Sequence, residues 1–205
     1  MGVSLPLLAV GEPAAPATEA WDMAIVKVPH LGRTFIMPAQ IEMLLSGIGV
    51  EYHRWSCTAP VSMSASSTQI VDAYATALES YKNAHGFASY DVVELTPETP
   101  GIDDMLGRFS KEHWHDEDEA HLIVAGRGVC NIHPVARPVM MVELEPGDFL
   151  CVGRGIRHWF DLCAERRLRA VRFVATKETS YTQSGIENEY EPVCLGPAYF
   201  AYQPR

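Results

Sequence analysis

Apolar residues recur at helical spacing in the first half of the chain. The clearest case is residues 66–87, where an apolar side chain returns every three or four positions, and this pattern predicts a helix. Its apolar stripe consists of Ile70, Tyr74, Leu78 and Tyr81. Ser66 or Ser67 can cap the start of this helix, and Gly86 can end it. We assign the stripe to the hydrophobic core, because one apolar helix face is normally buried.

A shorter helix is predicted over residues 38–49, with Pro38 in its first turn and Gly47 as its stop. The next residues, 50–55, alternate apolar and polar side chains as a strand does. From Phe87 onward the spacing changes, and short β-rich runs are separated by turns that contain glycine and proline. These runs are residues 88–95, 120–132, 139–152, 158–163 and 168–176. Many short strands with such turns predict an all-β barrel or jelly roll.

Composition narrows the class of protein. The 205 residues, 47% of them hydrophobic, are enough for one sizeable core. A formal net charge of -10 disfavours nucleic acid and anionic membranes as partners. No run approaches the roughly 20 apolar residues of a membrane helix. The five cysteines contain no Cys-x-x-Cys pair, so we expect reduced thiols in a cytoplasmic protein.

The candidate chemistry lies in residues 107–128, GRFSKEHWHDEDEAHLIVAGRG. If the chain is extended after Glu112, alternate side chains share one face. The side chains on that face are His113, His115, Glu119 and His121. The first two then lie roughly 7 Å apart along the strand, a separation that two imidazoles can close onto one ion. A further candidate ligand, His158, follows a glycine-rich turn in a second β-rich segment.

Three imidazoles and one carboxylate make a mixed nitrogen and oxygen donor set. The predicted metal ligands are His113, His115, Glu119 and His158. Such a set suits divalent iron, nickel or manganese in an octahedron with two open positions. Zinc is an alternative, but its preference for four ligands would leave no position for a chelating substrate. A His-x-His pair alone is a weak signal, so the prediction depends on the joint spacing of ligands and glycines.

That joint spacing resembles both motifs of the cupin family. The first runs from Gly107 through His113-x-His115 and Glu119 to Gly126; the second runs from Gly147 through Gly155 to His158. The resemblance implies a mainly β cupin fold, a double-stranded β-helix or jelly-roll barrel, with a few N-terminal helices. One position departs from the pattern, since Gly153 stands where cupins usually place proline.

Within cupins, the segment from about Ile41 to Phe173 is similar to the acireductone dioxygenase family, notably in EHWHDEDE and GDFLCVGRGIRHWFDL. The resemblance implies one Fe(II) or Ni(II) ion per chain on the four predicted ligands, and Phe160 as an aromatic residue near the substrate. It further implies a small substrate that chelates the metal through two oxygens before reacting with O2, and a monomeric protein.

Two departures from that family concern the substrate. His121 stands where the family has an arginine that can pair with an anionic substrate. It could accept a proton, act as a fifth ligand, donate to a different substrate, or be a structural histidine bonded to a backbone carbonyl. The family's tryptophan after the last barrel strand is also missing, because residues 175–185 contain only Tyr181 as an aromatic residue.

Three functions are therefore open. The first is a dioxygenase acting on acireductone, and the second a diverged dioxygenase that oxidises a thiol amino acid such as cysteine in a biosynthetic pathway. The third is a cupin that uses no O2, either a metal-dependent isomerase or a small-molecule binding module. Retention of all four ligands disfavours the binding module.

The remaining expectations concern organisation. Residues 1–20, which include the proline- and alanine-rich linker 11–19, are predicted to be a flexible arm, 21–180 a single cupin domain with a helical N-terminal part, and 181–205 a C-terminal extension. The histidines outside the ligand pattern, predicted to be structural or at the surface, are His30, His53, His85 and His133. The acids of residues 116–118 are interpreted as a solvated turn, with support of the ligands as the alternative.

Overall fold

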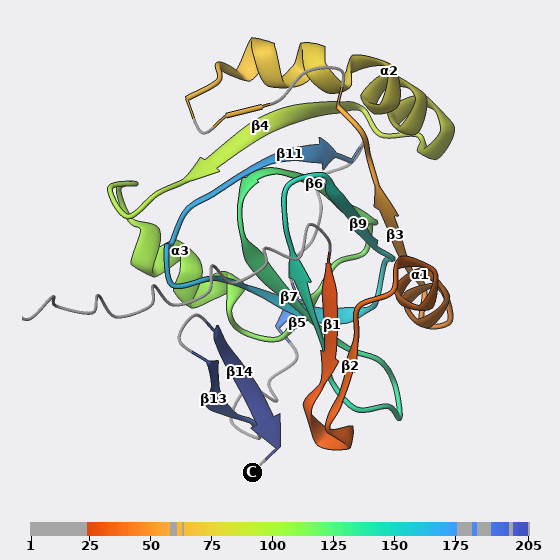
Figure 1. The fold of residues 1–205 in the computed structure, drawn as a ribbon, viewed down its shortest axis with the longest axis vertical. Helices are drawn as coiled ribbons and strands as arrows, with labels where there is room; N and C mark the ends of the chain where they lie inside the picture. Colours follow the sequence, from red (N-terminus) through yellow and green to blue (C-terminus); the bar gives the residue numbers. More distant parts are fainter. Residues whose placement is uncertain are drawn as a thin grey trace, which may run out of the picture.

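Two antiparallel β-sheets face each other and enclose the main hydrophobic core (Figure 1). The computed structural model describes residues 24–57, 61–62, 64–175, 182–183, 190–196 and 199–204, with backbone alone for those after 175. The predicted N-terminal arm and Tyr181 lie outside the described residues. Among the described residues, no helix is long and apolar enough to cross a membrane.

The larger sheet has the strand order β12-β5-β10-β7-β8-β1-β2. Its strands are β12 (Thr182–Gln183), β5 (His113–Trp114), β10 (Arg157–Leu162), β7 (Gly128–His133), β8 (Met140–Leu144), β1 (Ile25–Val28) and β2 (Arg33–Phe35). A short 3-10 helix, Pro29–Leu31, connects the last two.

The smaller sheet has the order β3-β9-β6-β11-β4. Its strands are β3 (Val50–Arg54), β9 (Asp148–Val152), β6 (Glu119–Gly126), β11 (Leu168–Val174) and β4 (Ser89–Leu95). A separate hairpin joins β13 (Tyr190–Gly196) to β14 (Tyr199–Pro204). The prediction of an all-β barrel or jelly roll is confirmed, and each predicted β-rich run contains at least one strand.

Side chains that alternate along the strands build the core between the sheets. From the larger sheet, Val26, Ile132 and Val142 belong to this cluster; from the smaller sheet, Ile123, Leu150 and Ala170 do. All six are essentially buried. The intervening side chains of the smaller sheet point to its other face, which is covered by a helix.

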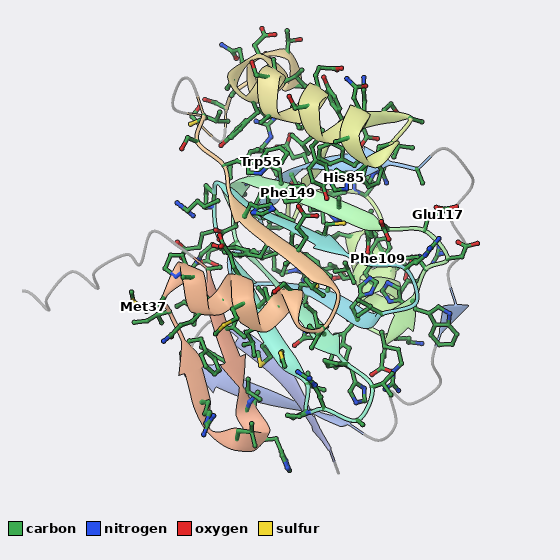
Figure 2. All side chains as sticks on the ribbon, turned by 90° about the vertical axis from the view of Figure 1, so that its right-hand side faces the viewer. Met37, Trp55, His85, Phe109, Glu117 and Phe149 are labelled. Atoms are coloured by element: carbon green, nitrogen blue, oxygen red, sulfur yellow. The ribbon has the colours of Figure 1, made fainter. Side chains whose placement is uncertain are left out.

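That covering helix is α2 (Ser67–His85), which lies over β4 and β11 in Figure 1. The predicted apolar stripe is buried as expected. It packs against an aromatic cluster in which the rings of Trp55 and Phe149 stack at 4.5 Å, and Figure 2 shows both between the helix and the sheet. The shorter predicted helix is α1 (Pro38–Ser46), which lies beside β3.

Ser66, rather than Ser67, caps α2. Its hydroxyl accepts a hydrogen bond from the amide of Gln69, whose side chain accepts one from the amide of Ser66, so the two residues form a capping box. We expect Ser66→Ala to lower the free energy of unfolding by about 1 kcal/mol in urea titrations. Ser67→Ala, one position further along the helix, removes no cap, so its free energy of unfolding should equal that of the wild type within error. Equal losses of free energy in both variants would contradict this assignment.

Among the described residues, several elements were not predicted from the sequence, including three before the candidate site. β1 and β2 are short strands in a segment for which neither a helix nor a strand was predicted, and α3 (Ile102–Phe109) was not predicted either. Gly107, the first glycine of the cupin-like spacing, lies within α3 and not in a turn. The acids Asp103 and Asp104 in the first turn of α3 favour the helix despite its glycine.

Candidate metal centre

Four side chains predicted as ligands converge on one point. One potential ligand atom from each of His113, His115, Glu119 and His158 lies within 4.8 Å of the others. His113 is on β5 and is the cross-strand partner of His158 on β10, while Glu119 begins β6 in the opposite sheet. The site therefore lies where the two sheets approach each other.

The expected single extended face from residue 113 to residue 121 is wrong in one respect. β5 ends at Trp114 and β6 begins at Glu119, so residues 115–118 form a loop through which the chain passes from one sheet to the other. His115 lies in that loop. The four side chains converge because the chain crosses between the sheets, rather than because they alternate along one strand.

The backbone fixes the orientation of two imidazoles. Nδ1 of His113 lies 2.7 Å from the carbonyl oxygen of Lys111, and Nδ1 of His158 lies 2.9 Å from that of Ile156. Since a carbonyl oxygen can only accept, each Nδ1 carries the proton. Nε2 is the remaining nitrogen, and a hydrogen bond of this kind is what holds metal-ligating histidines in one orientation.

The charges at the site favour a cation. Oε2 of Glu119 lies 2.7 Å from Nε2 of His158 and 3.5 Å from Nε2 of His115. Burial opposes ionisation of Glu119, but the hydrogen bond and charge of His158 lower its pKa. Burial also disfavours the charged form of His158, yet the bond to Glu119 outweighs it and raises the pKa of that ring. One carboxylate thus attracts positive charge among three imidazoles.

His113 supplies an uncharged nitrogen. Its burial, together with the nearby charge of His158, lowers its pKa to about 4, so the ring is neutral at physiological pH. Only 2% of His113 and 3% of His158 is exposed, whereas the side chain of Glu119 is 31% exposed. The site is consequently anchored in the barrel and open on the side of the carboxylate.

The turn between β9 and β10 supports the loop of residues 115–118. The amide of Gly155 donates to the carbonyl of His115 at 2.8 Å, and the amide of Arg154 donates to Oδ1 of Asp118 at 2.9 Å. Asp118 is exposed, as a solvated turn predicts, and its carboxylate also ties the loop to the turn. Glu117 is half-buried and lies toward the outer edge of the molecule (Figure 2).

Gly153, the departure from the cupin pattern, is explained by the same turn. Its amide donates to the carbonyl of Gly49 at 3.3 Å, which a proline could not do. A Cβ atom at this position would also lie 2.8 Å from that carbonyl oxygen. The turn is therefore held by close backbone contact between Gly153 and Gly49, the residue before β3, and not by the ring of a proline.

The two residues predicted near the substrate both lie on the inner side of the barrel. Phe160 follows His158 on the same face of β10 and packs against the core and against Gly128. His121 follows Glu119 on the same face of β6 and pairs across strands with Leu150 and Arg172. Burial lowers the pKa of His121, with the charge of Glu119 acting in the opposite direction. His121 is not part of the group of four convergent ligands.

Three buried or half-buried residues beside the site were not predicted to have a role. Glu112 contacts His133 and Arg157 on the reverse side of the sheet that carries His113 and His158. No sequence motif marks these residues, apart from the position of Glu112 directly before a ligand.

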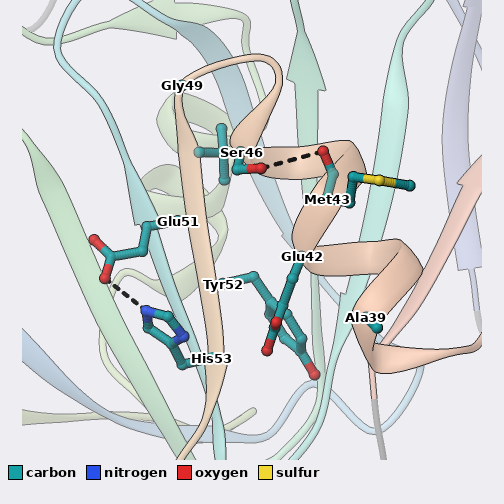
Figure 3. A pocket seen from close by; sticks show the side chains of 9 residues that line it. Ala39, Glu42, Met43, Ser46, Gly49, Glu51, Tyr52 and His53 are labelled. Carbon is teal, nitrogen blue, oxygen red and sulfur yellow. Dashed lines mark hydrogen bonds and ion pairs between the residues drawn. The ribbon is translucent and has the colours of Figure 1, made fainter.

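A surface groove lies away from the four convergent residues. It has a volume of about 630 Å³ and lies between α1 and β3, lined by residues that include Glu42, Met43, Glu51, Tyr52 and His53 (Figure 3). None of the four convergent residues lines it. The donor chemistry, rather than the size of a hollow, therefore identifies the candidate site.

Comparisons with known proteins show which proteins the chain is similar to. Residues 37–181 match the family model described as the ARD/ARD' family. An acireductone dioxygenase from Aquifex aeolicus is 34% identical over 165 residues, which cover 78% of this chain and 90% of that protein. One from Xanthomonas euvesicatoria pv. vesicatoria is 37% identical over 129 residues, or 63% of this chain and 68% of that protein.

A solved structure is also similar. It is an acireductone dioxygenase from Bacillus anthracis with a cadmium ion in its active centre, and it matches with a TM-score of 0.70 at 27% identity. The match covers 77% of this chain and 96% of that one.

Proposed function

Because the chain belongs to the ARD/ARD' family, we propose that it is a mononuclear metal-dependent dioxygenase that uses O2 to oxidise acireductone. The observation that carries this proposal is the convergence of three imidazoles and one carboxylate on a single point. The predicted family and the predicted cupin fold are both confirmed. The substrate and the metal are the parts that an experiment must decide.

We propose Fe(II) or Ni(II) as the ion, one per chain, on His113, His115, Glu119 and His158. The donor set fits, since mixed imidazole and carboxylate sites suit these divalent metals. When bound, such an ion would polarise and orient a substrate that chelates it through two oxygens. A monomer is expected, which light scattering after gel filtration would measure.

The chain's own residues would position the substrate around that ion. Phe160, packed against the inner core, offers an apolar wall that excludes water from one side. His121, next to Glu119 along β6, offers a ring nitrogen as a hydrogen-bond partner for a polar substrate atom. Glu119, on the more exposed side of the centre, lies where a small substrate can enter.

The test is O2 consumption by protein loaded with Fe(II) or with Ni(II). Acireductone and cysteine should be compared under identical conditions, with metal-free protein as the control for non-enzymatic oxidation. Metal-dependent O2 uptake with acireductone is the expected result. Absence of uptake by either loaded form, in protein that holds one ion per chain, would reject the acireductone proposal.

A diverged dioxygenase acting on a thiol amino acid such as cysteine is the second candidate. It is favoured by His121, which cannot supply the permanent charge of the family's arginine. Uptake of O2 with cysteine alone would select this function. Conversion of a substrate without O2 uptake would instead select the metal-dependent isomerase.

His121→Ala should separate substrate contact from metal binding. We expect the KM for the accepted substrate to rise about 10-fold, the loss associated with one hydrogen bond to a charged group, while metal content stays at one ion per chain. Steady-state kinetics and metal analysis measure the two effects. His53→Ala, an exposed histidine on β3, is the matched control and should leave both unchanged. An unchanged KM in His121→Ala would mean that His121 does not contact the substrate.

A further inference from the structure

A buried carboxylate and two half-buried basic side chains lie directly behind the candidate metal centre. We define this back cluster as Glu112, His133 and Arg157. Only 2% of Glu112 is exposed, and its Oε2 lies 2.7 Å from Nδ1 of His133. Its Oε1 lies 3.5 Å from Nη1 of Arg157. The cluster is thus a carboxylate held inside the protein between two basic side chains.

The back cluster and the ligands occupy opposite faces of the same strands. Glu112 directly precedes His113, and Arg157 directly precedes His158, so strand alternation places each pair on opposite sides of the sheet. Arg157 is the cross-strand partner of His133, as His158 is of His113. The three strands involved, β5, β10 and β7, are consecutive neighbours in the larger sheet.

β5 needs such support, because it has only two residues. Its pairing with β10 consists of the single residue pair His113 and His158. β12 pairs with the other edge of β5, but a strand this short forms few backbone hydrogen bonds with β10, so side-chain contacts add to what holds it there. Glu112 is the side chain that connects the start of β5 to both of the next two strands.

We propose that Glu112 is a positioning residue: its contacts with His133 and Arg157 hold β5 against β10 and thereby set the separation of the metal ligands His113 and His158. This inference rests on the proposed function, since it takes those two histidines as ligands. Removal of the charge of Glu112 takes the buried negative charge away from Arg157 and His133, which loosens β5 without removing any ligand.

The test compares two buried carboxylates on the same sheet. Glu112→Gln keeps the shape of the side chain and removes its charge. Glu143→Gln is the matched control: Glu143 is 6% exposed and pairs with Lys27 and Arg127, but it lies on β8, which carries no ligand. For both variants we would measure Co(II) affinity by competition with a chelator, the Co(II) absorption spectrum, and the melting temperature of the metal-free protein.

Glu112→Gln should bind Co(II) about 10- to 100-fold more weakly than the wild type and shift the Co(II) absorption bands, as changes behind a metal ligand generally do. Glu143→Gln should bind Co(II) as the wild type does, even if its melting temperature falls. His133→Phe removes the partner instead and should weaken Co(II) binding in the same direction. The double variant Glu112→Gln/His133→Phe should lose less Co(II) binding free energy than the two single variants lose in sum, because both substitutions act through one contact.

Equal Co(II) affinity and an unchanged spectrum in Glu112→Gln would overturn the inference, whatever happens to the melting temperature. If that variant does not fold, His133→Phe decides by the same two measurements. The proposed function fails separately, when wild-type protein binds one metal ion but consumes no O2 with any tested substrate. The positioning role could then still be judged from metal affinity alone.

Discussion

His158→Ala is expected to lower the affinity for Co(II) or Ni(II) by more than about 100-fold and to abolish metal-dependent O2 consumption. Loss of a residue that only orients a ligand already lowers metal affinity about 10- to 100-fold, and loss of the ligand itself should lower it further. His158 is the central member of the group: it is the cross-strand partner of His113 and lies 2.7 Å from Glu119. Its removal therefore takes away the donor that lies beside both His113 of the larger sheet and Glu119 of the smaller sheet.

Metal content after dialysis, chelator competition and O2 uptake measure this effect. Circular dichroism of the metal-free variant checks that the fold is retained. His53→Ala again serves as the control, because it removes an exposed histidine from a strand that carries no ligand. If His158→Ala retained one tightly bound ion per chain, the proposed ligand set would be wrong.

Gly126→Ala is expected to destabilise the fold by more than about 3 kcal/mol, and the variant should accumulate poorly in soluble form. Gly126 ends β6 with φ of +76°, a conformation that costs a residue with a side chain about 1–2 kcal/mol. In addition, a Cβ atom there would lie 2.1 Å from the carbonyl oxygen of Arg167. The clash is with backbone, so it cannot be relieved by rotation of a side chain.

Gly101→Ala separates these two causes. Gly101 has φ of +72°, but a Cβ atom there would meet nothing within 4 Å. This variant should lose only the conformational term, about 1–2 kcal/mol. Urea unfolding of both proteins gives the comparison, and similar losses would show that the contact with Arg167 carries no cost.

The sequence was most informative where two independent patterns agreed. His113, His115, Glu119 and His158 were predicted from ligand chemistry and glycine spacing together, and the structure brings them within 4.8 Å. Helix α2 was predicted because its stripe, its cap and its terminal glycine agree. Such agreement is informative because each signal has a separate physical cause.

Other features could not be predicted because they depend on contacts between distant segments. Glu112 lies 21 residues from His133 in sequence, and nothing local marks a carboxylate that is buried by pairing across two strands. Similarly, β1 has four residues and gains its place by pairing with β8. Gly153 was identified as a departure, but its reason became visible only with the carbonyl of Gly49 beside it.

The division of the donors between two sheets has a consequence for how the protein is made. His113 and His158 belong to one sheet and Glu119 to the other, and the donors come from segments 39 residues apart in sequence. The complete set therefore exists only after both sheets have formed and packed together. A newly synthesised chain would offer at most the partial set of residues 113–119, so tight metal binding would come late in folding. Once bound, the ion would oppose separation of the two sheets, because any ligand that binds only the folded state stabilises that state.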